Sequence, residues 1–229
     1  MAPAPVSTRA RPLLVALAVL GGALLVVVGL LLGAALVGSA STALPAEDSV
    51  DAGFARDMQV HHGQAVQMAV LLRDRSDDEE LRQMALDIEL TQQNQQGQML
   101  GWLQSWGLPQ ASTQPVMGWL SGPFSDDMAD MTMGEDTDAG ADDPMVAMGL
   151  ATPEQVAALE AADGVEAERV FLTLMVAHHR GGVQMASVAQ EEAVQPQVRR
   201  LATSMVNAQT LEIAVLQELL DARGGPIAV

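Results

Sequence analysis

The four histidines of this chain form two adjacent pairs, and methionines flank both pairs. The first pair stands in the segment FARDMQVHHGQAVQMA, which begins at Phe54, and the second in FLTLMVAHHRGGVQMA, which begins at Phe171. Imidazole and thioether groups without thiolate suit copper, above all Cu(I), while Cu(II) or Zn(II) can be bound through histidines alone. Because the chain contains no cysteine, disulfides, cysteine-type zinc sites, iron–sulfur clusters and thiol catalysis are excluded.

The two segments belong to a longer internal repeat with an offset of 117 residues. Its register continues without a gap to Gly107/Gly224 and Pro109/Pro226. Chance does not maintain such a register, so we infer a duplication, and residues separated by this offset are called repeat-related below. The identities within the two segments include Phe54/Phe171, Met58/Met175, His61/His178, His62/His179, Val66/Val183, Gln67/Gln184 and Met68/Met185.

The first copy predicts two helices. One covers about 51–75, and Asp77 then caps a second helix with Glu80 as its capping-box partner. Gly107 ends this second helix.

The second copy repeats the pattern with a helix over about 165–193 and another that starts near Pro196 and ends at Gly224. Four helices in two hairpins predict an all-α fold, namely an antiparallel four-helix bundle of the ferritin-like type. The two repeated hairpins cover 51–109 and 165–226.

Both histidine pairs fall on the apolar stripe of their helices, together with methionine and phenylalanine. We therefore expect the imidazoles to face the bundle interior or its rim, where pairing of the two helices would bring four imidazoles and four thioethers together. Buried imidazole nitrogens need partners. The second helix of each copy offers four polar residues: Gln92, Gln95, Gln209 and Glu212.

A purely structural network remains an alternative, in which Gln, Glu and water hold the histidines and methionine fills space. A di-iron carboxylate site is not expected, because it needs Glu from all four helices. Only Glu212 has a suitable inward position, and its repeat-related residue is Gln95. The oxygen-ligand cage that magnesium or calcium requires is also missing from the stripe.

Residues 110–164 form the connection between the copies. It is rich in Gly, Pro, Asp and Met, and Thr152 starts a short helix near its end that fades at Gly164. Most of the connection fits a disordered acidic loop, which could still collect cations weakly and pass them to the bundle. Its methionines are Met117, Met128, Met131, Met133, Met145 and Met148.

Residues 13–37 are uncharged and almost entirely Leu, Val, Ala and Gly. As a helix they would extend about 37 Å, enough to cross a hydrocarbon core of about 30 Å. We therefore expect a transmembrane anchor. A signal peptide cleaved within 39–43 is the alternative.

The charges around this segment predict its orientation. Arg9 and Arg11 precede it and the first charges that follow are acidic, so residues 1–12 should be cytoplasmic. Residues 38–50 then form a linker, and the body lies on the extracytoplasmic side of the cell membrane. Gly29 and Gly33 form a GxxxG pair that could support a weak dimer.

The formal net charge of the chain is −18. A body this acidic repels phosphate backbones, so no nucleic-acid partner is expected. Such a charge favours cations as ligands.

The paired F-x-x-x-M-x-x-H-H-x-x-x-x-x-M blocks, with M-x-x-M-G-x-x-T-P-E from Met145 to Glu154 before the second block, resemble the bacterial family called domain of unknown function 305 (DUF305). The resemblance covers about residues 50–223. It implies a ferritin-like helical bundle that is usually exported and is associated in some members with copper binding and copper tolerance. It also implies a set of candidate ligands: Met58, His61, His62, Met68, Met175, His178, His179 and Met185.

Two positions depart from the pattern of that family. The acidic residue that commonly precedes the second block, as Phe-Asp, is represented here by Ala167-Glu168. The small residue usual after the second histidine pair is replaced by Arg180, although Gly181 and Gly182 follow.

The resulting prediction is a membrane-anchored, outward-facing protein that buffers or passes on copper, with zinc as the alternative metal, and that catalyses nothing. An enzyme that oxidises or reduces metal with the same cluster is a second hypothesis. Redox catalysis needs an open coordination position and an electron route. The chain has no tyrosine, and its tryptophans lie off the histidine stripe. A metal-free interaction scaffold is the third hypothesis.

Overall fold

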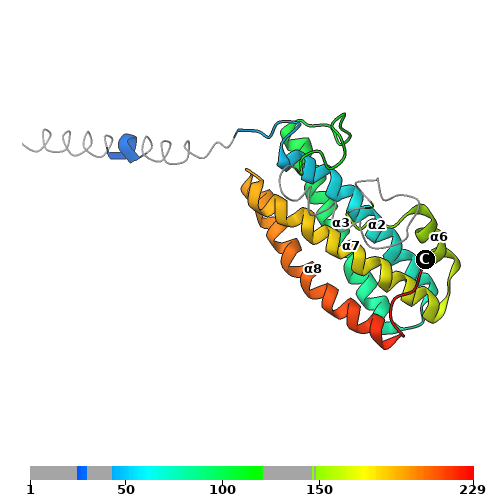
Figure 1. Ribbon diagram of the computed structural model, residues 1–229. Coiled ribbons are helices and arrows are strands. Elements are labelled where there is room, and N and C mark those ends of the chain that lie inside the picture. The colour runs from blue at the N-terminus through cyan, green and yellow to red at the C-terminus, as the bar shows by residue number, and fades with distance from the viewer. Residues whose placement is uncertain (1–24, 30–42, 121–145, 147) are drawn as a thin grey trace, which may run out of the picture. The chain divides into compact units, whose positions relative to one another are not determined.

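The computed structural model describes residues 25–29, 43–120, 146 and 148–229. Its main helices confirm the predicted all-α class, and their bounds lie close to the predicted ranges (Figure 1). Five main helices are found in the described ranges: α2 (Val50–Arg75), α3 (Glu79–Trp106), α6 (Pro153–Ala161), α7 (Gly164–Glu192) and α8 (Pro196–Ala222).

The chain divides into two units, Met1–Ala43 and Leu44–Val229. Of the predicted anchor at 13–37, only residues 25–29 are described, and they are helical. The predicted cytoplasmic segment 1–12 and Gly33 lie outside the described residues. Among the residues that are described, no helix is both long enough and apolar enough to cross a bilayer.

Capping explains where α3 begins and ends. The prediction that Asp77 caps this helix is wrong by one residue, because the Asp78 carboxylate accepts the backbone N–H of Leu81 at 3.0 Å. The second carboxylate oxygen of Asp78 accepts a hydrogen bond from the Arg223 guanidinium. This contact from the other hairpin favours Asp78 over Asp77 as the capping residue. Gly107 ends α3 as predicted, with a φ of 70° that favours glycine.

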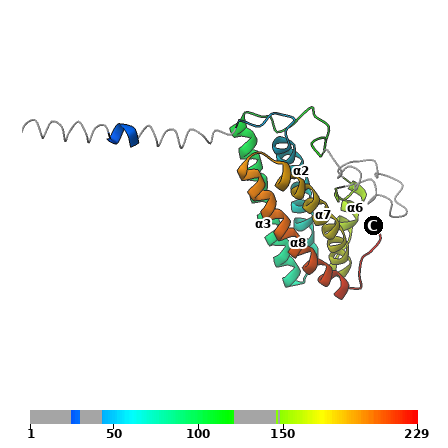
Figure 2. The same cartoon turned by 60° about the vertical axis from the view of Figure 1, so that its left-hand side comes forward.

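The helices pack in pairs (Figures 1 and 2). Helix α2 packs along α3, α7 packs along α8, and the two hairpins meet through α2 and α7. Helix α6 contacts both α2 and α7. The two helices that carry the histidine pairs are therefore direct neighbours.

Two clusters of buried apolar side chains make up the core. One contains Met58 of α2 with Met185 of α7, and the other contains Met68 of α2 with Met175 of α7. Early residues of one helix thus meet late residues of the other, so α2 and α7 run antiparallel. On each helix the histidine pair lies between its two methionines.

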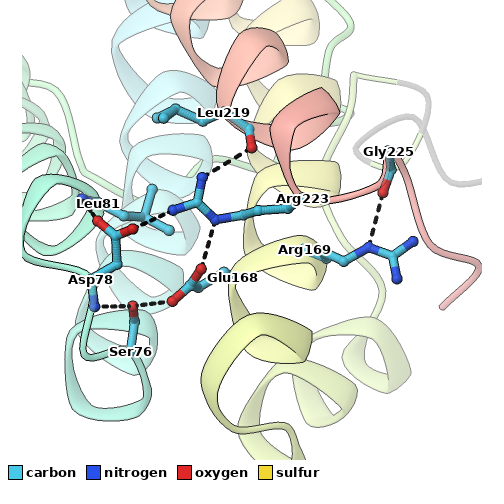
Figure 3. A network of polar contacts seen from close by, with 8 residues as sticks. All are labelled: Ser76, Asp78, Leu81, Glu168, Arg169, Leu219, Arg223 and Gly225. Atoms are coloured by element: carbon cyan, nitrogen blue, oxygen red, sulfur yellow. Dashed lines mark hydrogen bonds and ion pairs between the residues drawn. The ribbon is translucent and has the colours of Figure 1, made fainter.

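A polar network joins the two hairpins near the turn between α2 and α3 (Figure 3). Arg223 donates to Glu168 and to Asp78, both at 2.6 Å, and Ser76 donates to the other oxygen of Glu168 at 2.6 Å. Glu168 is only 5% exposed. Both oxygens of the acidic residue at the atypical Ala167-Glu168 position are therefore hydrogen-bonded.

Candidate metal site

All four histidine side chains are fully buried between the helices, as the apolar stripe predicted. His61 and His178 lie face to face, with ring centroids 3.7 Å apart and ring planes inclined by 35°. Within each adjacent pair the ring centroids are 6.2 Å apart. The imidazoles of the two copies thus meet in one layer, with the repeat-related rings of His61 and His178 in contact.

The outer histidine of each pair is held by the second helix of its own hairpin. His62 Nε2 lies 2.6 Å from the Gln95 carboxamide oxygen, and His179 Nε2 lies 2.7 Å from a Glu212 carboxylate oxygen. These two interactions are repeat-related, and both partners were predicted from the sequence. The charge differs between the copies, because a neutral amide in one stands where a carboxylate stands in the other.

The inner histidines bind main-chain oxygens instead. His61 Nε2 lies 3.3 Å from the Met148 carbonyl oxygen, and His178 Nε2 lies 2.8 Å from the carbonyl oxygen of His61. Carbonyl and carboxylate oxygens only accept hydrogen bonds, so each Nε2 carries the proton and each Nδ1 keeps a free lone pair. All four Nδ1 atoms are buried and have no hydrogen-bond partner within the described part of the chain.

Burial also keeps the imidazoles of His61, His62 and His178 neutral. It lowers the pKa of His61 to about 3 and the pKa of His62 to about 4, and it lowers the pKa of His178 well below 6.5. Repulsion from the neighbouring imidazoles contributes to the lowered pKa of both His61 and His178. These three rings are therefore neutral at pH 7, which is the form that binds metals.

The connection reaches His61 because small residues on α7 leave room for its backbone. A Cβ on Gly181 would overlap the Met148 carbonyl, and a Cβ on Gly149 would overlap the carbonyl of Ala177. Gly149 also has a φ of 83°, which favours glycine. From the sequence, Gly181 stood out only as a small residue that follows Arg180, because its packing role depends on a contact between segments distant in sequence.

A side chain of α2 holds the same connection from the other side. Gln64 accepts the backbone N–H of Ala151 at 2.7 Å and donates to its carbonyl at 2.8 Å. Gln64 is repeat-related to Gly181, so the two copies differ where the connection passes over them. Arg180, the other departure from the family pattern, is exposed.

Gln92 and Gln209, also predicted as histidine partners, play a different part. Both are more than nine-tenths buried, and the carboxamide oxygen of each lacks a hydrogen-bond partner among the described residues. A Cβ on Gly182 would overlap the Gln209 oxygen and would lie 3.1 Å from Cε1 of His61. The Gln209 oxygen is thus placed beside the inner histidine.

The structure does not bring all four thioethers together. Met58 and Met68 are ten residues apart, which is about 15 Å along a helix, and they belong to different core clusters. The same separation holds for Met175 and Met185. The four predicted methionine ligands therefore divide into two pairs, one in each cluster.

Two of the six methionines of the connection lie within the described residues. Met117 and Met148 are buried in the cluster that contains Met58. Met128, Met131, Met133 and Met145 lie outside the described residues, as do the acidic residues between them. Across the ranges that the structure describes, no three His, Asp or Glu side chains form a group that could hold a metal ion.

Comparison with known proteins identifies relatives of this chain. Residues 51–220 match the family model described as domain of unknown function (DUF305). A DUF305 protein from Streptomyces coelicolor, described as secreted, has a similar structure with a TM-score of 0.66 and 43% sequence identity, covering 80% of this chain and 99% of that chain. A DUF305 fragment from Deinococcus radiodurans follows with a TM-score of 0.57 and 31% identity, covering 76% of this chain and 96% of the fragment.

The fold is also that of CopM. Its Cu(II)-bound form has a TM-score of 0.53 at 23% identity, covering 76% of this chain and 97% of that chain. Its Cu(I)-bound form has a TM-score of 0.52 at 22% identity, with coverage of 75% and 96%. Among curated proteins, none matches this chain.

Proposed function

The chain belongs to the DUF305 family, and from this premise we propose that it binds copper at its buried histidines. The observation that carries the proposal is the layer of four imidazoles whose Nδ1 atoms are buried and lack a hydrogen-bond partner in the described residues. Leaving a buried polar atom unpaired costs about 1–3 kcal/mol, so four such atoms in one layer favour a ligand-binding role over packing alone. CopM, whose fold the chain shares, exists in Cu(II)- and Cu(I)-bound forms.

We assign the ligands to two repeat-related sites, and helix geometry and core packing support this assignment. Residues three and four positions apart are neighbours on a helix. Met58 and Met175 therefore lie next to the histidine pairs that follow them. The core clusters then add one methionine from the facing helix to each site. One site would comprise Met58, His61, His62 and Met185, and the other Met175, His178, His179 and Met68.

Copper fits this donor set better than zinc. Structural zinc sites use four Cys, His or carboxylate ligands in a tetrahedron, and the described residues offer no group of even three His, Asp or Glu. Thioether sulfur is a soft ligand that selects Cu(I). The second shell is also suitable, because each Nε2–H is fixed by an oxygen acceptor and so directs Nδ1 to the metal.

We place this copper-binding body outside the cytoplasm, attached to the cell membrane by residues 13–37. The uncharged length of that segment and the arginines before it support this placement. The secreted description of the Streptomyces coelicolor relative agrees with export. Alkaline extraction of membranes tests the anchor, since an anchored chain stays in the pellet and a chain cleaved near residue 43 is released.

The same geometry favours storage or transfer of copper over catalysis. Trp119, which could carry electrons, packs against Phe54 and donates to the Asp57 carboxylate. Its ring is thus engaged near the start of α2 and away from the imidazole layer. Turnover of Cu(I) under oxygen by the purified chain would instead support an oxidase.

Elemental analysis of the purified full chain after loading with Cu(I) tests the proposal. We expect the double variant H61A/H178A to lose tightly bound copper while circular dichroism shows its helices intact. M58L/M175L should also bind copper less tightly, whereas M99L, the same substitution at a buried methionine of α3, should not. Equal copper content in H61A/H178A and in the unmodified chain would contradict the proposal.

A further inference from the structure

A small pocket lies between α3 and α8, the outer helices of the two hairpins. Four of its polar lining residues form two repeat-related pairs, Gln92 with Gln209 and Gln95 with Glu212. The remaining lining residues form two further repeat-related pairs, with Thr91 at the exposed edge. The pocket thus follows the internal repeat.

Two residues that line the pocket are hydrogen-bonded to the histidine layer. Gln95 and Glu212, which line it, are the acceptors that hold His62 and His179. Gln209, which also lines it, places its carboxamide oxygen beside His61. An ion that occupied the pocket would be one side chain away from the imidazoles.

The opposite side of the histidine helices is closed by protein backbone. Met148 is packed against Gly181 without space for even a Cβ, and Gln64 fixes Ala151 through two hydrogen bonds. Helix α6 continues this cover over α2 and α7 (Figure 2). The side with the pocket, by contrast, is lined by side chains that can rotate.

The oxygen atoms of the pocket are suited to a cation. Gln92 and Gln209 are more than nine-tenths buried, and their carboxamide oxygens have no hydrogen-bond partner in the described part of the chain. Glu212 is the one ionisable residue among those that line the pocket, and 38% of its side chain is exposed. Its carboxylate therefore faces both solvent and His179.

We propose that this pocket is the passage through which copper enters and leaves the histidine layer, with Glu212 attracting the ion and the carboxamide oxygens of Gln92 and Gln209 replacing its hydration water on the way. This inference rests on the proposed function and adds a route to it. Carboxylate and carboxamide oxygens bind a hydrated cation and release it readily to imidazole and thioether, which are better ligands for copper.

The rate of copper uptake by the full chain tests the passage. A Cu(I)–acetonitrile complex is mixed with the protein, and unbound Cu(I) is trapped with excess bicinchoninate after timed delays. We expect E212Q to slow uptake at low salt by about tenfold and to weaken its salt dependence, and each rate is compared with the copper content of the same variant at equilibrium. The amide should still hold His179, as Gln95 holds His62. The control E218Q removes the same charge from an exposed position of α8 outside the pocket.

A second pair of variants tests the route itself. T91W places a large ring at the pocket edge and should slow both uptake and release, whereas T210W, at an exposed position of α8 outside the pocket, should not. Uptake by T91W at the rate of T210W, or equal rates for E212Q and E218Q, would overturn the passage while leaving copper binding intact. If the unmodified chain binds no copper at all, the proposed function itself is wrong.

Discussion

The Nδ1 atoms of the four histidines are buried and have no hydrogen-bond partner in the described residues, and these four atoms say most about what the protein does. The sequence alone predicts that both histidine pairs are buried, because they share a helical stripe with methionine and phenylalanine. It also predicts Gln95 and Glu212 as partners, because these residues recur at the repeat offset on the second helices. The carbonyl of Met148 as an acceptor for His61 could not be predicted, because that contact depends on how a loop crosses α7.

Neutral, buried imidazoles make stability depend on pH. The pKa values of His61 and His62 fall to about 3 and about 4 in the folded state, whereas the unfolded chain has values near 6.5. The unfolded state therefore binds more protons as the pH falls below 6.5. The stabilisation that these groups provide is complete above pH 6.5 and is lost progressively toward pH 3–4.

We therefore expect the metal-free protein to lose about 1 kcal/mol per pH unit for each of His61 and His62 between pH 6 and pH 4. Urea unfolding at a series of pH values measures this slope. H61A/H178A should show a shallower slope, because two of the groups are gone. If the urea concentration at the unfolding midpoint did not change between pH 7 and pH 5, the imidazoles could not be neutral and buried in the folded state.

Three glycines provide a graded test of packing around the site. Gly181→Ala should destabilise the protein by several kcal/mol, because its Cβ would overlap the rigid Met148 carbonyl. Gly182→Ala should lower the free energy of unfolding less than Gly181→Ala does, because its Cβ would meet the flexible end of the Gln209 side chain. Gly97→Ala, in α3 with nothing within 4 Å, should stabilise by about 0.5–1 kcal/mol. The order of the three unfolding midpoints checks the series.

At the scale of the helices, local sequence signals predict most of the helix ends, but not all of them. Gly107 and Pro196 end and begin their helices as predicted, because left-handed glycine and first-turn proline act locally. The choice between Asp77 and Asp78 as the cap of α3 is not local. It depends on Arg223, which lies in the last hairpin and binds Asp78.

The network around Arg223 should therefore hold the two hairpins together (Figure 3). We expect Arg223→Met to destabilise the protein by about 2–4 kcal/mol, because it leaves the buried Glu168 carboxylate without its cation. Arg73→Met, which removes a more exposed ion pair with Glu89, should cost less than about 1 kcal/mol. Thermal unfolding of both variants measures the difference. Equal losses would show that Glu168 does not need the guanidinium.

At the scale of the whole molecule, the internal repeat has consequences for stoichiometry. The helical stripes of the two copies predict one assembly of four imidazoles and four thioethers. The structure instead separates the thioethers into two pairs about 15 Å apart along the helices. Periodicity shows which face a residue occupies, but the antiparallel pairing of α2 with α7 decides which methionines meet.

We therefore expect the full chain to bind two copper ions, one on each side of the stacked rings. Metal analysis under saturating Cu(I) gives the number, and thermal unfolding should show a higher melting temperature, since a ligand of the native state stabilises it. M58L/M185L should remove one ion and leave the other. Complete loss of copper from that variant would instead indicate a single shared site.

The buried hydrogen bond from the His178 ring to the main chain of His61 joins the two hairpins. Neither hairpin can close this contact with its own atoms. A shorter polypeptide that carried a single hairpin would leave one imidazole face open to water, and it could cover that face only by associating with a second copy across a twofold axis. The fused chain makes this association independent of protein concentration, and it allows the two halves to diverge in charge, as Gln95 and Glu212 have done.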